Sequence, residues 1–159
     1  MNTPYWFFET HLRVLHDAQE TGGGYDLLEG CFPPGIETPL HLHTRYDELL
    51  YVLEGAFTVY TNTGTVTLAP GESLFVPRNT SHVVAGSGPA TNRALTIASP
   101  GGLARLVRTV GIPDVTEGIP PGHSNDMVLF LRAAQETGDI LLGSPGARPV
   151  LTPVAATHP

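Results

Sequence analysis

Residues 35–55 read GIETPLHLHTRYDELLYVLEG, and residues 71–82 read GESLFVPRNTSH. Glycines and prolines, which favour tight turns, punctuate both stretches. The three histidines of these stretches and one of their glutamates are candidate metal ligands: His41, His43, Glu48 and His82. We therefore predict one metal site, built between short strands.

The spacing of these four residues suits convergence on a single ion. Successive side chains of a strand point to opposite faces, so His41 and His43 should project from the same side, about 6.6 Å apart along the strand. Glu48 follows a polar connection of four residues, about the length that joins neighbouring strands. His82 lies shortly after a turn that begins at Pro77, near the start of another strand. Three imidazoles and one carboxylate are thus expected to meet.

Other titratable residues are assigned ordinary roles. Asp47 adjoins Glu48 but has the opposite strand parity, so it should point away from the site. Glu54 precedes Gly55 in a turn and is interpreted as a solvated carboxylate. The remaining histidines are interpreted as surface or partly buried residues without a catalytic role: His11, His16, His123 and His158.

Length and charge limit the class of protein. A chain of 159 residues is long enough for one domain with a genuine core. Its net charge of -7 argues against nucleic acid or an anionic membrane as a partner. The apolar run from Tyr5 to Phe8 is too short for a signal peptide or a membrane span. We therefore expect a cytoplasmic protein.

Three absences limit the chemistry that this chain can carry out. All 8 basic residues are arginine, so Schiff-base chemistry on lysine and a Gly-Lys-Ser/Thr phosphate loop are excluded. The single cysteine, Cys31, excludes an internal disulfide and a Cys-x-x-Cys site. No Gly-x-Ser-x-Gly motif is present, which leaves covalent nucleophilic catalysis without a good candidate. Of the reaction types considered, metal-dependent chemistry is the one that remains.

Short runs rich in valine, leucine, threonine and aromatic residues recur along the chain, separated by glycine, proline and asparagine. Regular short strands with turn residues between them predict an all-β sandwich or barrel. The expected strands are 11–16, 25–32, 38–43, 47–53, 56–60, 65–68, 73–77, 81–85 and 93–98.

The periodicity changes after the last expected strand. A first amphipathic helix is indicated by apolar residues at helical spacing: Leu103, Leu106, Val107 and Val110. A second should begin after a cap at Ser124 or Asn125 and present one apolar face: Met127, Phe130, Leu131 and Ala134. We predict a single domain, with a barrel at about 10–100, a helical extension at about 102–143 and a flexible tail at 144–159.

Both opening stretches resemble the two-part signature of the cupin superfamily. Over roughly residues 5–143 the chain most resembles the quercetin 2,3-dioxygenase-like monocupins. The segments that carry this resemblance are 20–23, 39–43, 47–55, 70–82, 100–102 and 140–143. Two positions depart from the usual second motif: Asn79 replaces a glycine, and Gly86 stands where asparagine is common. Neither supplies a ligand, and asparagine tolerates left-handed backbone conformations.

The resemblance implies a cupin fold, which is a double-stranded β-helix or jelly-roll barrel, and one divalent transition metal ion. Four protein ligands on an ion that accepts six leave two positions for water, dioxygen or a chelating substrate. Imidazoles and a carboxylate suit Fe, Mn, Ni, Co, Cu and Zn alike. The resemblance also implies that Glu48 can act as a base toward a substrate hydroxyl, provided that its surroundings raise its proton affinity.

Strand parity nominates the walls of a substrate pocket. If Glu48 faces inward, then so do Leu50 and Val52, and Phe57 and Val59 should continue the apolar lining from the next strand. Such a pocket suits an aromatic or polyketide-like substrate better than a sugar. The alternative is that these residues simply fill the core of the barrel.

Three functions remain open from the sequence. The first is a metal-dependent dioxygenase that cleaves a flavonol-like or related enolisable aromatic compound. The second is a cupin enzyme that uses the metal without dioxygen, as an isomerase, cyclase, dehydratase or lyase in natural-product biosynthesis. The third is a ligand-binding cupin without turnover. A homodimer is expected, because a small barrel has sheet edges to cover.

Overall fold

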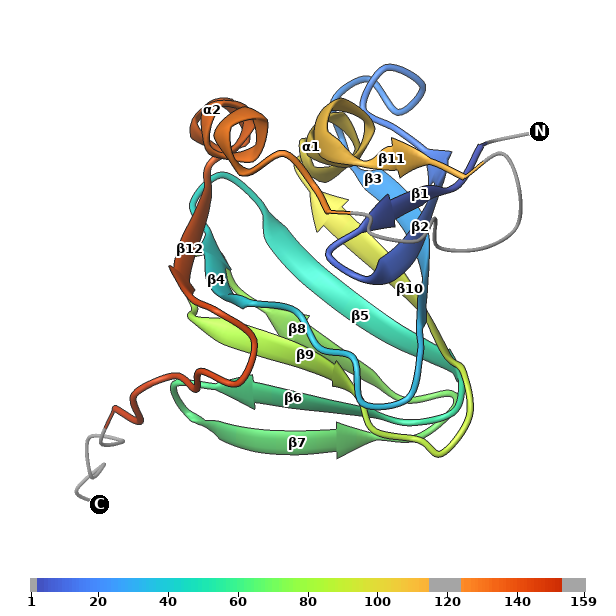
Figure 1. Ribbon diagram of the computed structural model, residues 1–159, viewed down its shortest axis with the longest axis vertical. Helices are drawn as coiled ribbons and strands as arrows, with labels where there is room; N and C mark the ends of the chain where they lie inside the picture. The colour runs from blue at the N-terminus through green and yellow to red at the C-terminus, as the bar shows by residue number, and fades with distance from the viewer. Residues whose placement is uncertain (1–2, 115–123, 153–159) are drawn as a thin grey trace.

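The computed structural model describes residues 3–114 and 124–152, and its core is two antiparallel β-sheets (Figure 1). The larger sheet has the order β11-β1-β2-β3-β10-β5-β8. In that order its strands are Ile112–Pro113, Tyr5–Phe7, Thr10–His16, Asp26–Phe32, Asn92–Ser99, Asp47–Glu54 and Ser73–Val76. The smaller sheet has the order β12-β4-β9-β6-β7. Its strands are Asp139–Gly143, Leu40–His43, His82–Gly86, Phe57–Thr61 and Gly64–Leu68.

All nine strands predicted from the sequence are present, with ends that differ by at most two residues. The structure adds three strands that the sequence pattern did not predict: β1, β11 and β12. Strands β1 and β11 have three and two residues, which is too short for a periodicity to register. Strand β12 begins directly after a helix, and it pairs with β4, the strand that carries His41 and His43. The segment predicted as a helical extension therefore contributes a strand to the smaller sheet.

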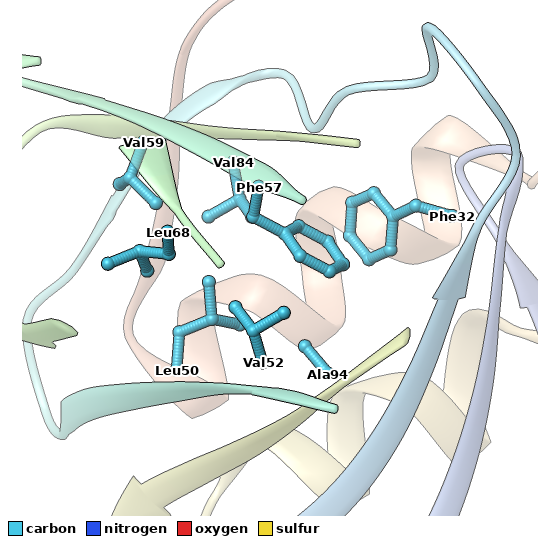
Figure 2. Close-up of a cluster of buried hydrophobic side chains, with 8 residues drawn as sticks. All are labelled: Phe32, Leu50, Val52, Phe57, Val59, Leu68, Val84 and Ala94. Carbon is cyan, nitrogen blue, oxygen red and sulfur yellow. The ribbon is translucent and has the colours of Figure 1, made fainter. Parts of the chain in front are cut away.

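A compact apolar cluster lies between the two sheets (Figure 2). Side chains from both sheets interlock there, and the rings of Phe32 and Phe57 meet edge to face, 5.2 Å apart. The cluster consists of Phe32, Leu50, Val52, Phe57, Val59, Leu68, Val84 and Ala94. Because these side chains are almost completely removed from water, their burial is a main source of the barrel's stability.

Two helices cover the end of the molecule that also holds β1 and β2 (Figure 1). Helix α1 spans Leu103–Val110 and α2 spans Met127–Thr137. The four apolar residues predicted for α2 divide into two pairs: Phe130 and Ala134 are buried against α1, whereas Met127 and Leu131 are exposed. The predicted cap is wrong by one or two residues. Asp126 caps α2, because its carboxylate accepts hydrogen bonds from the second and third N–H groups of the helix.

Part of the segment predicted as a flexible tail makes defined contacts. Arg148 forms an ion pair with Glu37 at 2.9 Å, and its guanidinium lies 4.1 Å from the centre of the Tyr60 ring. Thr152 donates a backbone hydrogen bond to the carbonyl of Asn62. Residues 153–159 of the predicted tail lie outside the described residues. In 3–114 and 124–152, neither helix is long and apolar enough to cross a membrane.

Candidate metal centre

The structure brings the four predicted ligands together at one point. His41 and His43 lie on β4, Glu48 lies on β5, and His82 begins β9. The neighbouring strands β4 and β9 pair His41 with His82. One potential ligand atom from each of the four residues lies within 4.8 Å of the others. The cluster is therefore suitable for one metal ion.

Each imidazole is oriented by a hydrogen bond at Nδ1. The Nδ1 atom of His41 lies 2.8 Å from the carbonyl oxygen of Pro39, and that of His82 lies 2.8 Å from the carbonyl of Thr80. A backbone carbonyl only accepts, so Nδ1 carries the proton in both rings. Their Nε2 lone pairs are then available to a metal ion. This arrangement is typical of metal-binding histidines.

The third imidazole is held by a buried carboxylate. His43 Nδ1 lies 2.7 Å from Asp139 Oδ1, at the start of β12. Asp139 also accepts hydrogen bonds from the hydroxyls of Tyr46 and Thr137. The Tyr46 ring stacks on His43, with centroids 4.4 Å apart and planes at 25°. These contacts fix both the position of the His43 ring and the nitrogen that faces the centre.

Sequence reasoning missed the supporting role of Asp139 and Tyr46. Tyr46 belongs to the polar connection between His43 and Glu48, where a solvated side chain would be expected, yet only 1% of its surface is exposed. Asp139 is far from the signature stretches in sequence, and only its short strand carries it to β4. The one available signal was an aspartate placed between Gly138 and an apolar run. It identified no partner.

Burial and mutual contact shift the pKa values of the groups in the cluster. Burial lowers the pKa of His43, but the adjacent Asp139 and Glu48 carboxylates outweigh this and raise it to about 9. For Glu48 the directions are reversed. Burial raises its pKa, but the imidazoles of His43 and His82 outweigh burial and bring it well below its usual value. Burial and the two facing imidazoles lower the pKa of His41 well below its ordinary value. Glu48 and His43 thus form a buried ion pair, with Oε2 and Nε2 2.8 Å apart.

The Nε2 atom of His82 is the most direct indication that the cluster suits a metal ion. His82 is fully buried, and its Nε2 has no hydrogen-bond partner. That atom lies 3.4 Å from Glu48 Oε2, which is close enough for attraction but lacks hydrogen-bond geometry. A buried polar nitrogen without a partner is costly. A metal ion bound between His82 and the other ligands would satisfy it, so the donor set fits one.

A cavity opens from the cluster toward the helices and the β1–β2 turn. Its empty volume, which includes solvent at its opening, is about 830 Å³. The lining is mainly apolar and includes four phenylalanines, Phe7, Phe8, Phe32 and Phe130, together with leucines of α1. Three of the ligands, all except His82, also line it. The cavity therefore places apolar walls around one side of the candidate metal centre.

Of the four residues predicted to line the pocket, only Leu50 does so. Val52, Phe57 and Val59 are completely buried in the core cluster, away from the cavity lining. Their inward direction was predicted correctly, but an inward direction does not distinguish the hollow part of the barrel from its filled part. For these three residues the alternative, core packing, is the correct one.

The neighbouring residues largely behave as the strand pattern predicted. Asp47 points away from the cluster and pairs with Arg78 at 2.8 Å, which lowers the pKa of Asp47 to about 2. Asn79 adopts the predicted left-handed conformation, with φ of 65°. His11 and His16 pair with Asp114 and Glu20 outside the cluster. The other two histidines given ordinary roles, His123 and His158, lie outside the described residues.

Comparison with known proteins identifies the family. The cupin domain matches residues 28–98, which include all four candidate ligands. The chain therefore contains a cupin domain. This cupin is 30% identical over 101 residues to quercetin 2,3-dioxygenase of Bacillus subtilis (strain 168). The match covers 64% of the chain but only 30% of that dioxygenase, so the chain spans less than a third of its length.

Solved structures agree on the fold. The polyketide cyclase RemF from Streptomyces resistomycificus is 31% identical, with a TM-score of 0.51 over 58% of this chain and 66% of the cyclase. A predicted oxalate decarboxylase from Thermotoga maritima is 20% identical, with a TM-score of 0.58 over 62% of this chain and 92% of the other. At that identity the second likeness shows the fold alone. The similarities therefore establish the barrel, and they span proteins with different named activities.

Proposed function

We propose that this cupin is a metal-dependent enzyme that acts on a small aromatic substrate, flavonol-like or polyketide-like, with dioxygenase activity as the leading candidate. The observation that carries the proposal is the position of the three imidazoles and Glu48 beside an apolar cavity. Metal ligands with room beside them are typical of a catalytic rather than a structural site. The likeness to a quercetin 2,3-dioxygenase supports the choice of reaction.

The proposed ligands are His41, His43, Glu48 and His82, with the histidines binding through Nε2. A divalent transition metal bound there would act as a Lewis acid and lower the pKa of a substrate hydroxyl that coordinates it. The identity of the ion is left open between Fe, Mn, Ni, Co, Cu and Zn, because this donor set suits all of them.

Glu48 is the proposed proton acceptor. Its Oε2 atom lies against the Nε2 atoms of His43 and His82, and the hydrogen bond from His43 together with the nearby His82 imidazole lowers the pKa of Glu48. Imidazoles that bind through Nε2 no longer donate to Glu48. A coordinated carboxylate is a poor base, so Glu48 would accept a proton only on leaving the ion, where burial raises its proton affinity. Glu48 can then take the proton of an enolic or phenolic hydroxyl.

The cavity wall supports an aromatic substrate over a phosphorylated one. Among the described residues that line the cavity, none is arginine, and the whole chain contains no lysine. Phosphate recognition normally uses such cations. Phenylalanine rings instead offer flat apolar surfaces, and leucine side chains add apolar contact. The threonines Thr10, Thr38 and Thr96 contribute scattered hydroxyls. A planar compound with a few oxygen atoms matches this lining.

A second candidate is a reaction without dioxygen, such as cyclisation. It is favoured by the 31% identity to the polyketide cyclase RemF, a match that covers 58% of this chain. The same residues would serve, since proton removal by Glu48 and exclusion of water by the apolar wall are needed for either reaction. The two candidates differ in their requirement for oxygen.

The test uses protein reconstituted separately with each of the six metals. Quercetin is added in air and under nitrogen, and its visible absorbance and the dissolved oxygen are followed. We expect absorbance loss matched by oxygen consumption, at least 100-fold slower in Glu48→Gln, which still binds metal. Conversion of a polyketide-type substrate under nitrogen would favour the second candidate. Binding of such compounds without conversion by any metal form would contradict both and leave a ligand-binding cupin.

We also propose that the chain forms a homodimer through the outer face of the larger sheet. Tyr51 and Leu53 on β5 and Phe75 on the edge strand β8 are exposed there, and 58% of the Phe75 surface is accessible. An apolar edge strand favours pairing with a second chain. Light scattering should give twice the chain mass, and Phe75→Glu should give the monomer mass. A monomeric parent would contradict this.

A cytoplasmic location stays a prediction.

A further inference from the structure

The turn between β1 and β2 has an unusual backbone. Phe7 pairs with Thr10, so only Phe8 and Glu9 connect the two strands. Both have positive φ angles, 47° and 62°. Turns of this kind favour asparagine and glycine, because a side chain with a Cβ is strained in the left-handed region. Two strained positions in succession call for a reason, since glycine would form the same turn more easily.

Several contacts hold this turn in place. The backbone N–H of Phe8 donates to Asn125 Oδ1 at 2.9 Å. The side-chain amide of Asn125 in turn donates to the carbonyls of Trp6 at 3.2 Å and Val110 at 3.1 Å. Asn125 therefore ties the β1–β2 turn to the end of α1. A strained backbone persists only where its surroundings fix it in this way.

The two residues of the turn have different surroundings. Glu9 is exposed. Phe8 is half-buried, and its ring lies edge to face with Phe130 at 5.1 Å and with Phe7 at 4.8 Å. All three rings line the cavity that contains the candidate metal ligands. The left-handed turn thus presents an aromatic side chain to the cavity at a position where glycine would present none.

We propose that Phe8 is a specificity-determining residue, which packs against the part of a multi-ring substrate that extends beyond its metal-binding oxygens. This inference rests on the proposed function, because it takes the cavity as the substrate site. The strained turn is retained for the ring that it carries. Phe8 thereby favours planar substrates with more than one ring over small chelators with the same oxygen donors.

The test compares two chelators on zinc-loaded protein, in which binding is measured without turnover. Quercetin carries a hydroxypyranone unit fused to and substituted with further rings, whereas maltol is a single hydroxypyranone ring. Affinities are measured by absorbance titration for the parent, Phe8→Gly and the matched variant Glu9→Gly. Zinc content is measured before and after each titration, so that loss of metal is not mistaken for weak binding.

In Phe8→Gly we expect quercetin affinity to fall about tenfold or more while maltol affinity stays within about twofold. In Glu9→Gly we expect both affinities to be unchanged and the Tm to rise by about 2–4 °C, because one strained position is relieved without loss of the ring. Phe8→Leu retains apolar packing against Phe130 and replaces Phe8→Gly if that variant does not fold. Its quercetin affinity should also fall.

Unchanged quercetin affinity in the folded Phe8 variants would overturn the inference and leave Phe8 as a packing residue of the Phe130 cluster. Equal losses for quercetin and maltol would overturn it as well, because they would indicate general damage to the site. If neither chelator binds zinc-loaded parent protein, the proposed function itself fails. The two failures are therefore distinguishable.

Discussion

The two ends of this barrel use the same strands but differ in what fills them. Along β5 the inward residues are Glu48, Leu50 and Val52: the first lies in the candidate metal centre, the second touches both cavity and core, and the third is completely buried. The filled end is closed by β6 and β7. The hollow end is walled by the β1–β2 turn, α1, α2 and β12. The candidate metal ligands therefore lie on strands of the barrel, whereas much of the cavity wall comes from the β1–β2 turn, the helices and β12.

The largest effect on stability is expected at the filled end. Phe57→Ala removes a completely buried ring that packs on Phe32, and it should lower the free energy of unfolding by about 3–5 kcal/mol. Zinc affinity, measured by titration below the unfolding temperature, should be retained, because Phe57 does not line the cavity. Loss of zinc binding in the folded variant would show that the two ends are coupled.

The hollow end should give the metal-free protein a pH-dependent stability. The pKa of His43 is about 9 in the fold and about 6.5 in an unfolded chain, so protonated His43 stabilises the folded state. This contribution, at most about 3 kcal/mol, is fully present below pH 6.5 and is lost as the pH rises through 9. Urea unfolding of chelator-treated protein between pH 6 and 9.5 measures it.

Two controls sharpen the pH experiment. His43→Gln should remove the decline in stability, whereas Phe57→Ala should retain it at a lower overall stability. Zinc-loaded protein should show a weaker decline, because a coordinated imidazole carries no proton at the metal-binding nitrogen. A parent protein whose stability is flat across this range would contradict the buried ion pair of His43 and Glu48.

A smaller effect, on metal affinity, is expected at Asp139, whose carboxylate forms a hydrogen bond with Nδ1 of His43. Asp139→Asn should weaken zinc affinity by about 10–100-fold without unfolding the barrel, because Asp139 orients His43. Asp47→Asn is the matched control, since Asp47 adjoins Glu48 in sequence but pairs with Arg78 instead. Calorimetric titration with zinc compares the two. Equal affinities for both variants would mean that the Asp139 contact does not position the ligand.

The same division explains what the sequence could predict. The ligands follow from local rules, because two histidines two residues apart share a strand face and a short connection returns the chain beside them. Strand parity also predicted the inward direction of Val52 and Phe57. It could not show that they lie in the core, because direction alone carries no information about depth.

The wall of the cavity could not be predicted from the sequence, for a different reason. It is made by contacts between residues about 90 to 120 positions apart, such as Asp139 with His43 and Asn125 with Phe8. No local periodicity reports such pairs. Asn125 was predicted as a helix cap from its residue type, but its amide instead binds the β1–β2 turn. Residue type identified a capacity for hydrogen bonding without identifying the partner.

The most direct test of the account is the zinc stoichiometry of chelator-treated protein, measured by titration and elemental analysis. The parent should bind about one zinc ion per chain, and His82→Ala should lose at least 100-fold in affinity, because the buried Nε2 of His82 is a proposed ligand. His16→Ala, at an exposed histidine outside the cluster, should bind like the parent. A parent that binds no zinc, or a His82→Ala variant that binds it equally well, would contradict the central claim.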